Sequence, residues 1–192
     1  MGLYMAKFTK KAIRISLLKL LEKNEIEKIS VKDICELCEI TRNTFYYYYS
    51  DIYQVLEELL KTEADNVIMK NQEYDSFEEE FLQRYHLILE YKQAVYHLYH
   101  SKNRDMILKY FCDVTEDFVK KYVKNEAVGT KLSEDDVNYV TYFYSNSIIG
   151  TTLRWLHDGM KDSQEELIYR LSLSFQSTIK PLISELDQKT KH

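Results

Sequence analysis

The sequence predicts an all-α protein, and three observations support that prediction. Glycine and proline together number only 5 of 192 residues, too few for the many turns of a β-sandwich or a β-barrel. Hydrophobic residues make up 45% and charged residues 30% of the chain, which is ordinary globular usage and excludes bulk disorder. Apolar residues also recur at helical spacing from near the start, as in Ile13, Leu17, Leu20 and Leu21. A chain of this length forms one domain or two small ones.

Capping residues and apolar stripes divide the chain into about nine helices. The first is expected from about Thr9 to Asn24, with a basic face opposite its apolar one. Breaks are expected near residues 25–29, 39–41, 50, 72–75, 91–92, 101–103, 126–132 and 159–162. Residues with the chemistry and spacing of helix N-caps are Ser30, Thr41, Asp51, Ser76, Ser133 and Ser163. Pro181 either kinks the last helix or begins a terminal turn.

The net charge of −5 is unevenly distributed along the chain. Residues 1–50 hold 9 Lys/Arg and 6 Asp/Glu, a balance of +3, whereas residues 51–192 hold 17 and 25, a balance of −8. This asymmetry suggests a small anion-binding module on a larger acidic body.

Three cysteines, Cys35, Cys38 and Cys112, are too few for a disulfide framework, and the N-terminus lacks the pattern of a signal peptide. The longest uncharged stretch, Val137 to Leu153, carries several Asn, Ser and Thr residues and does not indicate a membrane span. We therefore expect a cytoplasmic protein with reduced thiols and no membrane partner.

Residues 30–49 have the size and spacing of a helix-turn-helix, with the second short helix as the recognition helix. Arg42 can reach a guanine edge and Asn43 an adenine edge, while tyrosine hydroxyls and a helix start near Lys32 suit phosphates. In a helix, Phe45 and Tyr49 are expected in the core; a stacking platform for single strands is the alternative for the tyrosine run. The predicted contacts with double-stranded DNA are Ser30, Val31, Lys32, Thr41, Arg42, Asn43, Thr44, Tyr46, Tyr47 and Tyr48.

The run ISVKDICELCEITRNTFYYYYSDIY, residues 29–53, resembles the N-terminal DNA-binding domain of the TetR/AcrR family of transcriptional regulators. The segment GTTLRWLHDG, residues 150–159, resembles a C-terminal domain of Firmicutes members related to the dihydroxyacetone-kinase activator. The resemblance implies an all-helical homodimer that binds operator DNA through its first three helices. It also implies a DNA-binding domain over residues 1–50, a connecting helix over 51–71, and a C-terminal domain over 72–192 that dimerises and holds a small effector.

The chain departs from the family pattern at three positions. Glu39 stands where many relatives have a turn glycine, and a left-handed glutamate costs roughly 1 kcal/mol. Tyr48 replaces a phosphate-contacting histidine, and Ile52 replaces a lysine at the start of the fourth helix. These changes predict weaker phosphate binding, with a shallower dependence of affinity on salt.

The C-terminal part is expected to provide an effector pocket and a dimer interface. Candidate pocket residues are the aromatic and histidine side chains Tyr85, Tyr96, Tyr99, His100, Phe111, Phe118, Tyr142 and Phe143. The uncharged stretch 137–153 is expected to be buried against both its own domain and a partner, or else to be the central helix of a monomer. Candidate interface residues are Ser145, Ile149, Gly150, Leu153, Leu171 and Phe175.

The sequence thus predicts a dimeric repressor that binds a near-palindromic operator, is modulated by a small effector, and needs no cofactor. One alternative is a regulator whose C-terminal domain binds a protein partner. A helical metal-dependent enzyme using His97, His100 or Glu90 is the other alternative, although no common nucleophile or nucleotide-binding motif is present. The pair Cys35 and Cys38 lacks the second pair of a structural zinc site, so we expect both to be packing residues and no metal to be bound.

Overall fold

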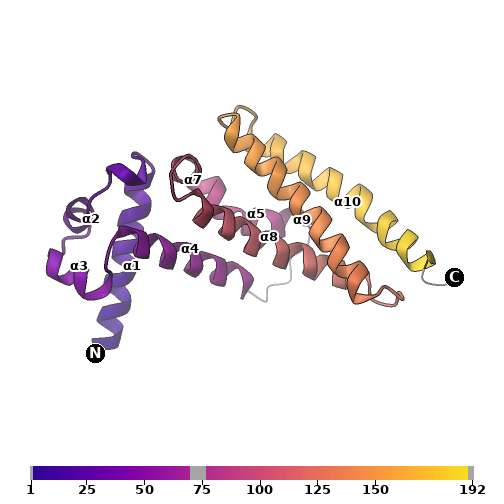
Figure 1. The fold of residues 1–192 in the computed structure, drawn as a ribbon, viewed down its shortest axis with the longest axis horizontal. Coiled ribbons are helices and arrows are strands. Elements are labelled where there is room, and N and C mark those ends of the chain that lie inside the picture. The colour runs from indigo at the N-terminus through magenta and orange to yellow at the C-terminus, as the bar shows by residue number, and fades with distance from the viewer. Residues whose placement is uncertain (1, 70–76, 190–192) are drawn as a thin grey trace. The chain divides into compact units, whose positions relative to one another are not determined.

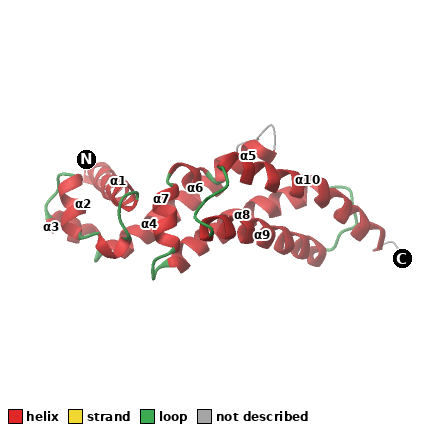
Figure 2. Cartoon of the chain, turned by 90° about the horizontal axis from the view of Figure 1, so that it is seen from above, coloured by secondary structure: helices red, strands yellow, loops and turns green. Residues whose placement is uncertain are grey.

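The computed structural model describes residues 2–69 and 77–189, and every regular element in these ranges is helical (Figure 2). This confirms the predicted all-α class. The described α-helices are α1 (Gly2–Leu21), α2 (Val31–Leu37), α3 (Arg42–Tyr48), α4 (Ile52–Ile68), α5 (Phe77–Arg84), α6 (His86–Glu90), α7 (Lys92–Tyr99), α8 (Arg104–Glu126), α9 (Glu134–His157) and α10 (Gln164–Lys189). They number ten rather than about nine because an interruption at Tyr85 separates α5 from α6.

Side-chain caps begin the helices where the sequence predicts them. Thr41 Oγ1 accepts a hydrogen bond from Thr44 N at 3.1 Å, and Asp51 Oδ1 accepts one from Gln54 N at 2.9 Å. Ser163 Oγ accepts from a backbone amide at 3.2 Å, and both Ser30 and Ser133 take part in full capping boxes. The predicted cap Ser76 lies outside the described residues.

The ends of the first and last helices are less well predicted. The helix α1 begins at Gly2 rather than Thr9 and ends at Leu21, and a short 3-10 helix, Ile26–Lys28, follows it. The early turns carry no capping residue that would mark their start in the sequence. Pro181 lies inside α10, which continues to Lys189, so the proline does not end the helix.

The chain divides into two compact units, and the first comprises Met1–Asn66 and Leu87–Tyr110. Its core includes the apolar face of α1 predicted from the sequence, with Ile13, Leu17 and Leu21 fully buried. The helix α2 packs against both α1 and α3, and α7 packs against α1; Figure 1 shows α1, α2 and α3 close together.

Reciprocal caps join α7 to the end of α1. The carboxylate of Glu22 accepts a hydrogen bond from Ala94 N at 3.0 Å in the first turn of α7. In the opposite direction, His97 Nδ1 donates to the carbonyl oxygen of Leu21, the last residue of α1, at 2.6 Å. Each helix therefore satisfies backbone groups that the other leaves unpaired. The sequence places residues 87–110 in the C-terminal domain, whereas this packing includes them in the first unit.

The second unit comprises Val67–His86 and Phe111–His192. Aromatic rings fill its core: the ring centroids of Phe81 and Tyr85 lie 4.2 Å apart, and Phe118 contacts both Phe81 and Phe175 at about 6 Å. The hydroxyl oxygens of Tyr85 and Thr115 are 2.7 Å apart, so the buried phenol has a partner.

Helices α9 and α10 lie side by side in the second unit (Figure 1). Between them, Gly159 adopts a φ of 79°, and Met160 N donates to the carbonyl of Trp155 at 2.9 Å. These features form a left-handed helix stop of the kind that favours glycine. The indole Nε1 of Trp155 donates to the Asp162 carbonyl at 2.9 Å and ties the connecting loop to α9. No helix in the described ranges is long and apolar enough to cross a membrane.

Candidate nucleic-acid interface

The helix α3 separates its buried residues from its polar ones. Phe45 and Tyr49, four residues apart, are buried, as the sequence predicts. Tyr46 and Tyr47 are 56% and 81% exposed, and Arg42 is also exposed at the start of the helix. Asn43 is exposed beside Arg42, so one short helix presents two forked side chains and two phenols to solvent.

Thr41 and Thr44 serve the structure of α3. Besides the cap from Thr41 to the backbone of Thr44, the two hydroxyl oxygens lie 2.9 Å apart. Because one hydroxyl donates to the other, these side chains have less free hydrogen-bonding capacity than Arg42 and Asn43. The sequence predicts both the cap and a DNA contact for Thr41, and the structure shows the cap.

The tyrosine run does not form a flat platform. The rings of Tyr47 and Tyr48 meet edge to face, with centroids 4.8 Å apart and an interplanar angle of 86°. Tyr46 meets the buried Phe45 in the same way at 5.5 Å. Tyr48 is half-buried, which leaves Tyr46 and Tyr47 as the most accessible phenols of the helix.

The start of α2 offers a phosphate fewer free N–H groups than the sequence predicts. The amide of Ser30 donates to Asp33 Oδ2 at 2.8 Å, so this N–H is not available to a phosphate as expected. Hydrogen bonds from the side chain and backbone of Ser30 hold the pKa of Asp33 below its usual value. Val31 is half-buried, whereas the Lys32 side chain is 62% exposed.

Lys32 also has an acidic partner that was not predicted from the sequence. Its Nζ lies 3.5 Å from Glu36 Oε1, one turn further along α2. The signal for this pair was present in the sequence, because residues four apart are neighbours on a helix.

The turn between α2 and α3 keeps its left-handed geometry without glycine. Glu39 has a φ of 54°, as the family resemblance implies for that position. Ile52, at the start of α4, is buried in the first unit, so its side chain packs in the core.

A three-residue ionic cluster connects α1 to α4, the two α-helices that precede and follow the helix-turn-helix in the chain. Glu58 of α4 accepts hydrogen bonds from Lys10 at 2.7 Å and from Arg14 at 2.6 Å, both on α1. The Lys10 ammonium also lies 5.1 Å from the ring centroid of Tyr49. Burial raises the pKa of Tyr49 to about 12. The sequence pattern does not predict this cluster because its members are 44 and 48 residues apart in the chain.

The histidines and cysteines considered as metal ligands have other contacts. Cys35 is buried, and Cys38 Sγ donates to the Ile34 carbonyl at 3.0 Å. His97 is bonded to Leu21 as described above, and His100 packs against Tyr96 with ring centroids 4.4 Å apart. No group of three or more His, Cys, Asp or Glu among residues 2–69 and 77–189 could hold a metal ion.

The eight candidate pocket residues do not form one cluster within either unit. Tyr96, Tyr99 and His100 lie in the first unit on or beside α7. In the second unit, Tyr85, Phe111 and Phe118 are buried in the core. Tyr142 and Phe143 lie on α9 and are 67% and 48% exposed. The structure therefore places the last two on the surface of the second unit.

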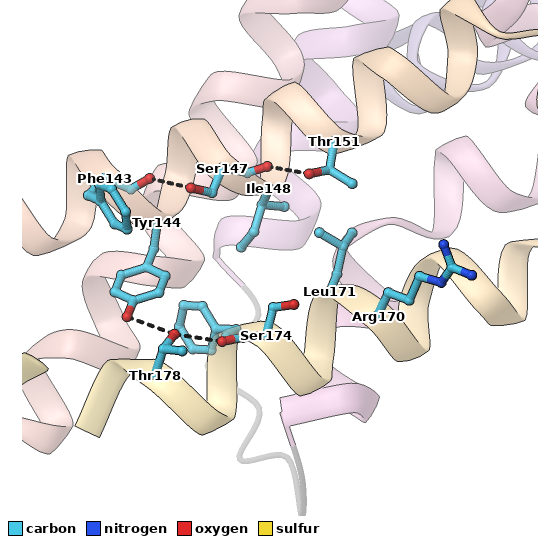
Figure 3. A pocket seen from close by; sticks show the side chains of 10 residues that line it. Phe143, Tyr144, Ser147, Ile148, Thr151, Arg170, Leu171, Ser174 and Thr178 are labelled. Atoms are coloured by element: carbon cyan, nitrogen blue, oxygen red, sulfur yellow. Dashed lines mark hydrogen bonds between the residues drawn. The ribbon is translucent and has the colours of Figure 1, made fainter. Parts of the chain in front are cut away.

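A groove of about 360 Å³ lies between α9 and α10 (Figure 3). Phe143 is the one residue of the eight candidates that lines it. The Tyr144 hydroxyl donates to Thr178 Oγ1 at 2.9 Å across the groove, while Ser147 and Thr151 bond to carbonyls of their own helix. The walls are mainly apolar, and Arg170, which is paired with Glu166, is the one charged residue among the described residues that line the groove.

The outward faces of α9 and α10 beside this groove form an uncharged face. Its exposed members on α9 between residues 137 and 153 are Asn138, Tyr139, Tyr142, Phe143, Asn146, Ser147, Gly150 and Thr151. Those on α10 between residues 171 and 179 are Leu173, Ser174, Gln176, Ser177 and Thr178. A surface helix normally shows charges on its outer side, so this composition is unusual for a face that remains in water.

Most of the residues predicted for a dimer interface are buried within the second unit itself. The four buried ones are Ser145, Ile149, Leu171 and Phe175, whereas Gly150 is exposed and Leu153 is half-buried. The stretch 137–153 has two uncharged sides, and the sequence pattern did not distinguish the side that faces α10 and the core from the side that faces solvent.

Comparison with known proteins extends these observations. The family TetR_C_8, described as the C-terminal region of transcriptional regulators, matches residues 75–177. The solved structure of the dihydroxyacetone kinase operon activator DhaS is similar, with a TM-score of 0.77 and 20% identity over 90% of this chain and 96% of that chain. A TetR transcriptional regulator from Streptococcus agalactiae 2603V has a TM-score of 0.61 and 23% identity, over 89% and 95% of the two chains.

No curated protein matches the sequence. The family match covers more than half of the chain, and the two solved structures share its all-helical fold. The helix-turn-helix, the all-helical fold and the matched C-terminal region together show that the chain belongs to the TetR family of transcriptional regulators.

Proposed function

We propose that the protein is a homodimeric regulator that binds a near-palindromic operator through α2 and α3. The observation that carries this proposal is the outward placement of Arg42, Asn43, Tyr46 and Tyr47 on a helix that Phe45 anchors in the core. Arginine and asparagine are the side chains whose forked geometry suits guanine and adenine edges in the major groove.

The proposed contacts divide into two classes. Arg42 and Asn43 read base edges, whereas Tyr46 and Tyr47 donate phenolic hydroxyls to phosphates. Lys32 adds a phosphate contact from α2. Thr41 and Thr44 support α3, and Tyr48, half-buried, contributes at most one hydroxyl to the backbone of the duplex.

A second copy of the chain is the proposed partner of the uncharged face on α9 and α10. Tyr142, Phe143 and Leu173 would lose their exposed apolar area there, which favours association. Gly150 leaves open space above its Cα, so a partner helix can approach closely. In a two-fold dimer, two recognition helices about 34–36 Å apart would reach successive major grooves.

We propose repression by operator occupancy, relieved by a small effector bound in the C-terminal domain over residues 72–192. Such an effector would favour one of two pre-existing states that differ in the separation of the recognition helices. Support for the effector comes from the family resemblance and from the aromatic composition of this domain.

Selection of bound sequences from a random duplex library tests the proposal. We expect the wild-type protein to enrich a motif with two-fold symmetry and half-sites about one helical turn apart. A folded, dimeric protein that enriches no motif would contradict DNA reading by α3.

A second candidate function is activation through a protein partner that binds the C-terminal domain. One of the similar solved structures is that of an operon activator, and this observation favours the candidate. A reporter gene with the selected operator upstream of its promoter separates the two. Expression that falls when the protein is present indicates repression, and expression that rises indicates activation.

A further inference from the structure

The helix-turn-helix itself carries a negative net charge. Residues 30–49 contain two cations, Lys32 and Arg42, against three carboxylates, Asp33, Glu36 and Glu39, which gives −1. The positive balance of the first fifty residues therefore comes from α1 and the segment after it, not from the motif that would meet the duplex. For a surface proposed to bind a polyanion, this charge is opposite to the usual one.

Two of the carboxylates follow Lys32 closely in α2, one at the next residue and one a helical turn later. Glu36 Oε1 lies 3.5 Å from Lys32 Nζ, and both side chains are well exposed, at 65% and 62%. Asp33, next to Lys32 in the chain, is bound to Ser30 and has a lowered pKa, so it stays ionised at neutral pH. A phosphate that approaches Lys32 therefore meets a cation that already has a carboxylate partner.

We infer that Glu36 is a negative determinant of DNA affinity, which competes with phosphate for Lys32 and so weakens binding to every sequence alike. This inference rests on the proposed function, since it assumes that α2 lies against the duplex backbone. Binding would require Lys32 to exchange the Glu36 carboxylate for a phosphate oxygen, so the ion pair with Glu36 is lost when the duplex binds. Sequence discrimination would be left to Arg42 and Asn43, because phosphate contacts carry no sequence information.

Removal of the charge at Glu36 tests the inference. Glu36→Gln should tighten binding to a pool of random 30-base-pair duplexes by about two- to fivefold, the range for an exposed ion pair. The tightening on the duplex selected from the library should be the same. The slope of log affinity against log salt should steepen by up to about 0.9, the value for one added phosphate contact. This slope is a readout that a change in stability alone would not move.

Two matched variants complete the test. Glu185→Gln removes the same charge from an exposed position on α10 and should leave both affinity and slope near wild type. The double variant Lys32→Ala/Glu36→Gln should bind like Lys32→Ala alone, because Glu36 acts through Lys32. Thermal unfolding of each variant verifies that the fold is retained.

The outcomes separate this inference from the proposed function. If wild type binds the duplexes and Glu36→Gln changes neither affinity nor slope, the inference is wrong and the proposed function stands. A gain confined to the selected duplex would also overturn it, since Glu36 would then act at a base edge. If neither wild type nor Glu36→Gln binds any duplex at low salt, the proposed function fails as well.

Discussion

Single side chains on α2 and α3 divide the proposed recognition between base edges and phosphates. Arg42 lies exposed at the first turn of α3, next to the cap at Thr41 that fixes its backbone. Lys32 lies on α2 with Glu36 as its partner. Arg42 is predicted to contact a base edge and Lys32 a phosphate. Alanine variants of the two residues distinguish these roles.

Arg42→Ala should weaken binding to the selected duplex by about 1–3 kcal/mol, the value of one bidentate base contact. Binding to random duplexes should change little. Lys32→Ala should weaken both kinds of duplex alike, because it removes only a phosphate contact. Titration of each variant with both duplexes gives the four affinities. Equal, uniform losses from the two variants would mean that Arg42 contacts only the backbone.

Glu58→Gln should lower the free energy of unfolding at neutral pH by about 0.5–1 kcal/mol, because Glu58 is partly exposed and pairs with two cations of α1. Burial alone would raise the pKa of Glu58, but the hydrogen bond and charge of Lys10, with the charge of Arg14, hold it below the usual 4.5. A lowered pKa gives stability that is present above the unfolded value and is lost as the pH falls through the folded one.

Chemical denaturation between neutral pH and pH values below 4.5, the usual pKa of this carboxyl, checks this prediction. Wild type should lose more stability over that interval than Glu58→Gln, whose amide does not titrate there. Glu57→Gln, at the exposed neighbouring position on α4, is the matched control and should retain the wild-type acid dependence. Parallel acid profiles for wild type and Glu58→Gln would show that the cluster contributes nothing.

At the scale of elements, short polar signals determine where helices start and stop. The capping boxes of α2 and α9 occur at the predicted serines, and the stop of α9 uses Gly159 in the left-handed region. The turn between α2 and α3 instead places a glutamate there, with φ at 54° for Glu39. A non-glycine residue in this conformation is strained by roughly 1–2 kcal/mol.

Glu39→Gly should therefore raise the free energy of unfolding by about 0.5–1 kcal/mol. The strain released is partly offset by the greater freedom that glycine gives the unfolded chain. Thermal or urea unfolding measures the change. Glu25→Gly, at an exposed extended position with φ at −62°, is the control and should be destabilising. A loss of stability in Glu39→Gly would show that the left-handed turn is not strained.

At the scale of the whole molecule, the uncharged face of α9 and α10 determines the proposed assembly. Its aromatic and small side chains remain exposed in one subunit, and a second copy would bury them symmetrically.

Tyr142→Glu should weaken dimerisation at least tenfold, on the order of the cost of burying unpaired charge, because two-fold symmetry places two new carboxylates in a desolvated interface. Sedimentation equilibrium measures the dissociation constant. Val128→Glu introduces the same charge at an exposed apolar position outside α9 and α10, and it should leave the dimer intact. A Tyr142→Glu protein that remains as dimeric as Val128→Glu would exclude this face as the interface.

Much of the fold can be predicted because its signals are local. The caps at Ser30, Thr41 and Ser133 and the helical spacing of apolar residues predicted most of the helix boundaries within the described residues, while the predicted break near residues 72–75 lies outside them. The break at Tyr85 and the early start of α1 carry no such signal. For the candidate site, the sequence predicted Arg42 at the start of the recognition helix, and the structure shows its side chain exposed there while Phe45 is buried.

By itself the sequence determined the all-helical class, most of the helix starts and the helix-turn-helix, and its motifs indicated the family, since caps, periodicity and motif spacing depend on residues a few positions apart. Only the tertiary structure showed that Glu58 pairs with α1, that His97 caps the same helix, and which side of α9 faces solvent. These features join residues tens of positions apart, or separate two sides of one uncharged helix. Distance along the chain and hydrophobic pattern do not encode them, so the packing of the helices decides them.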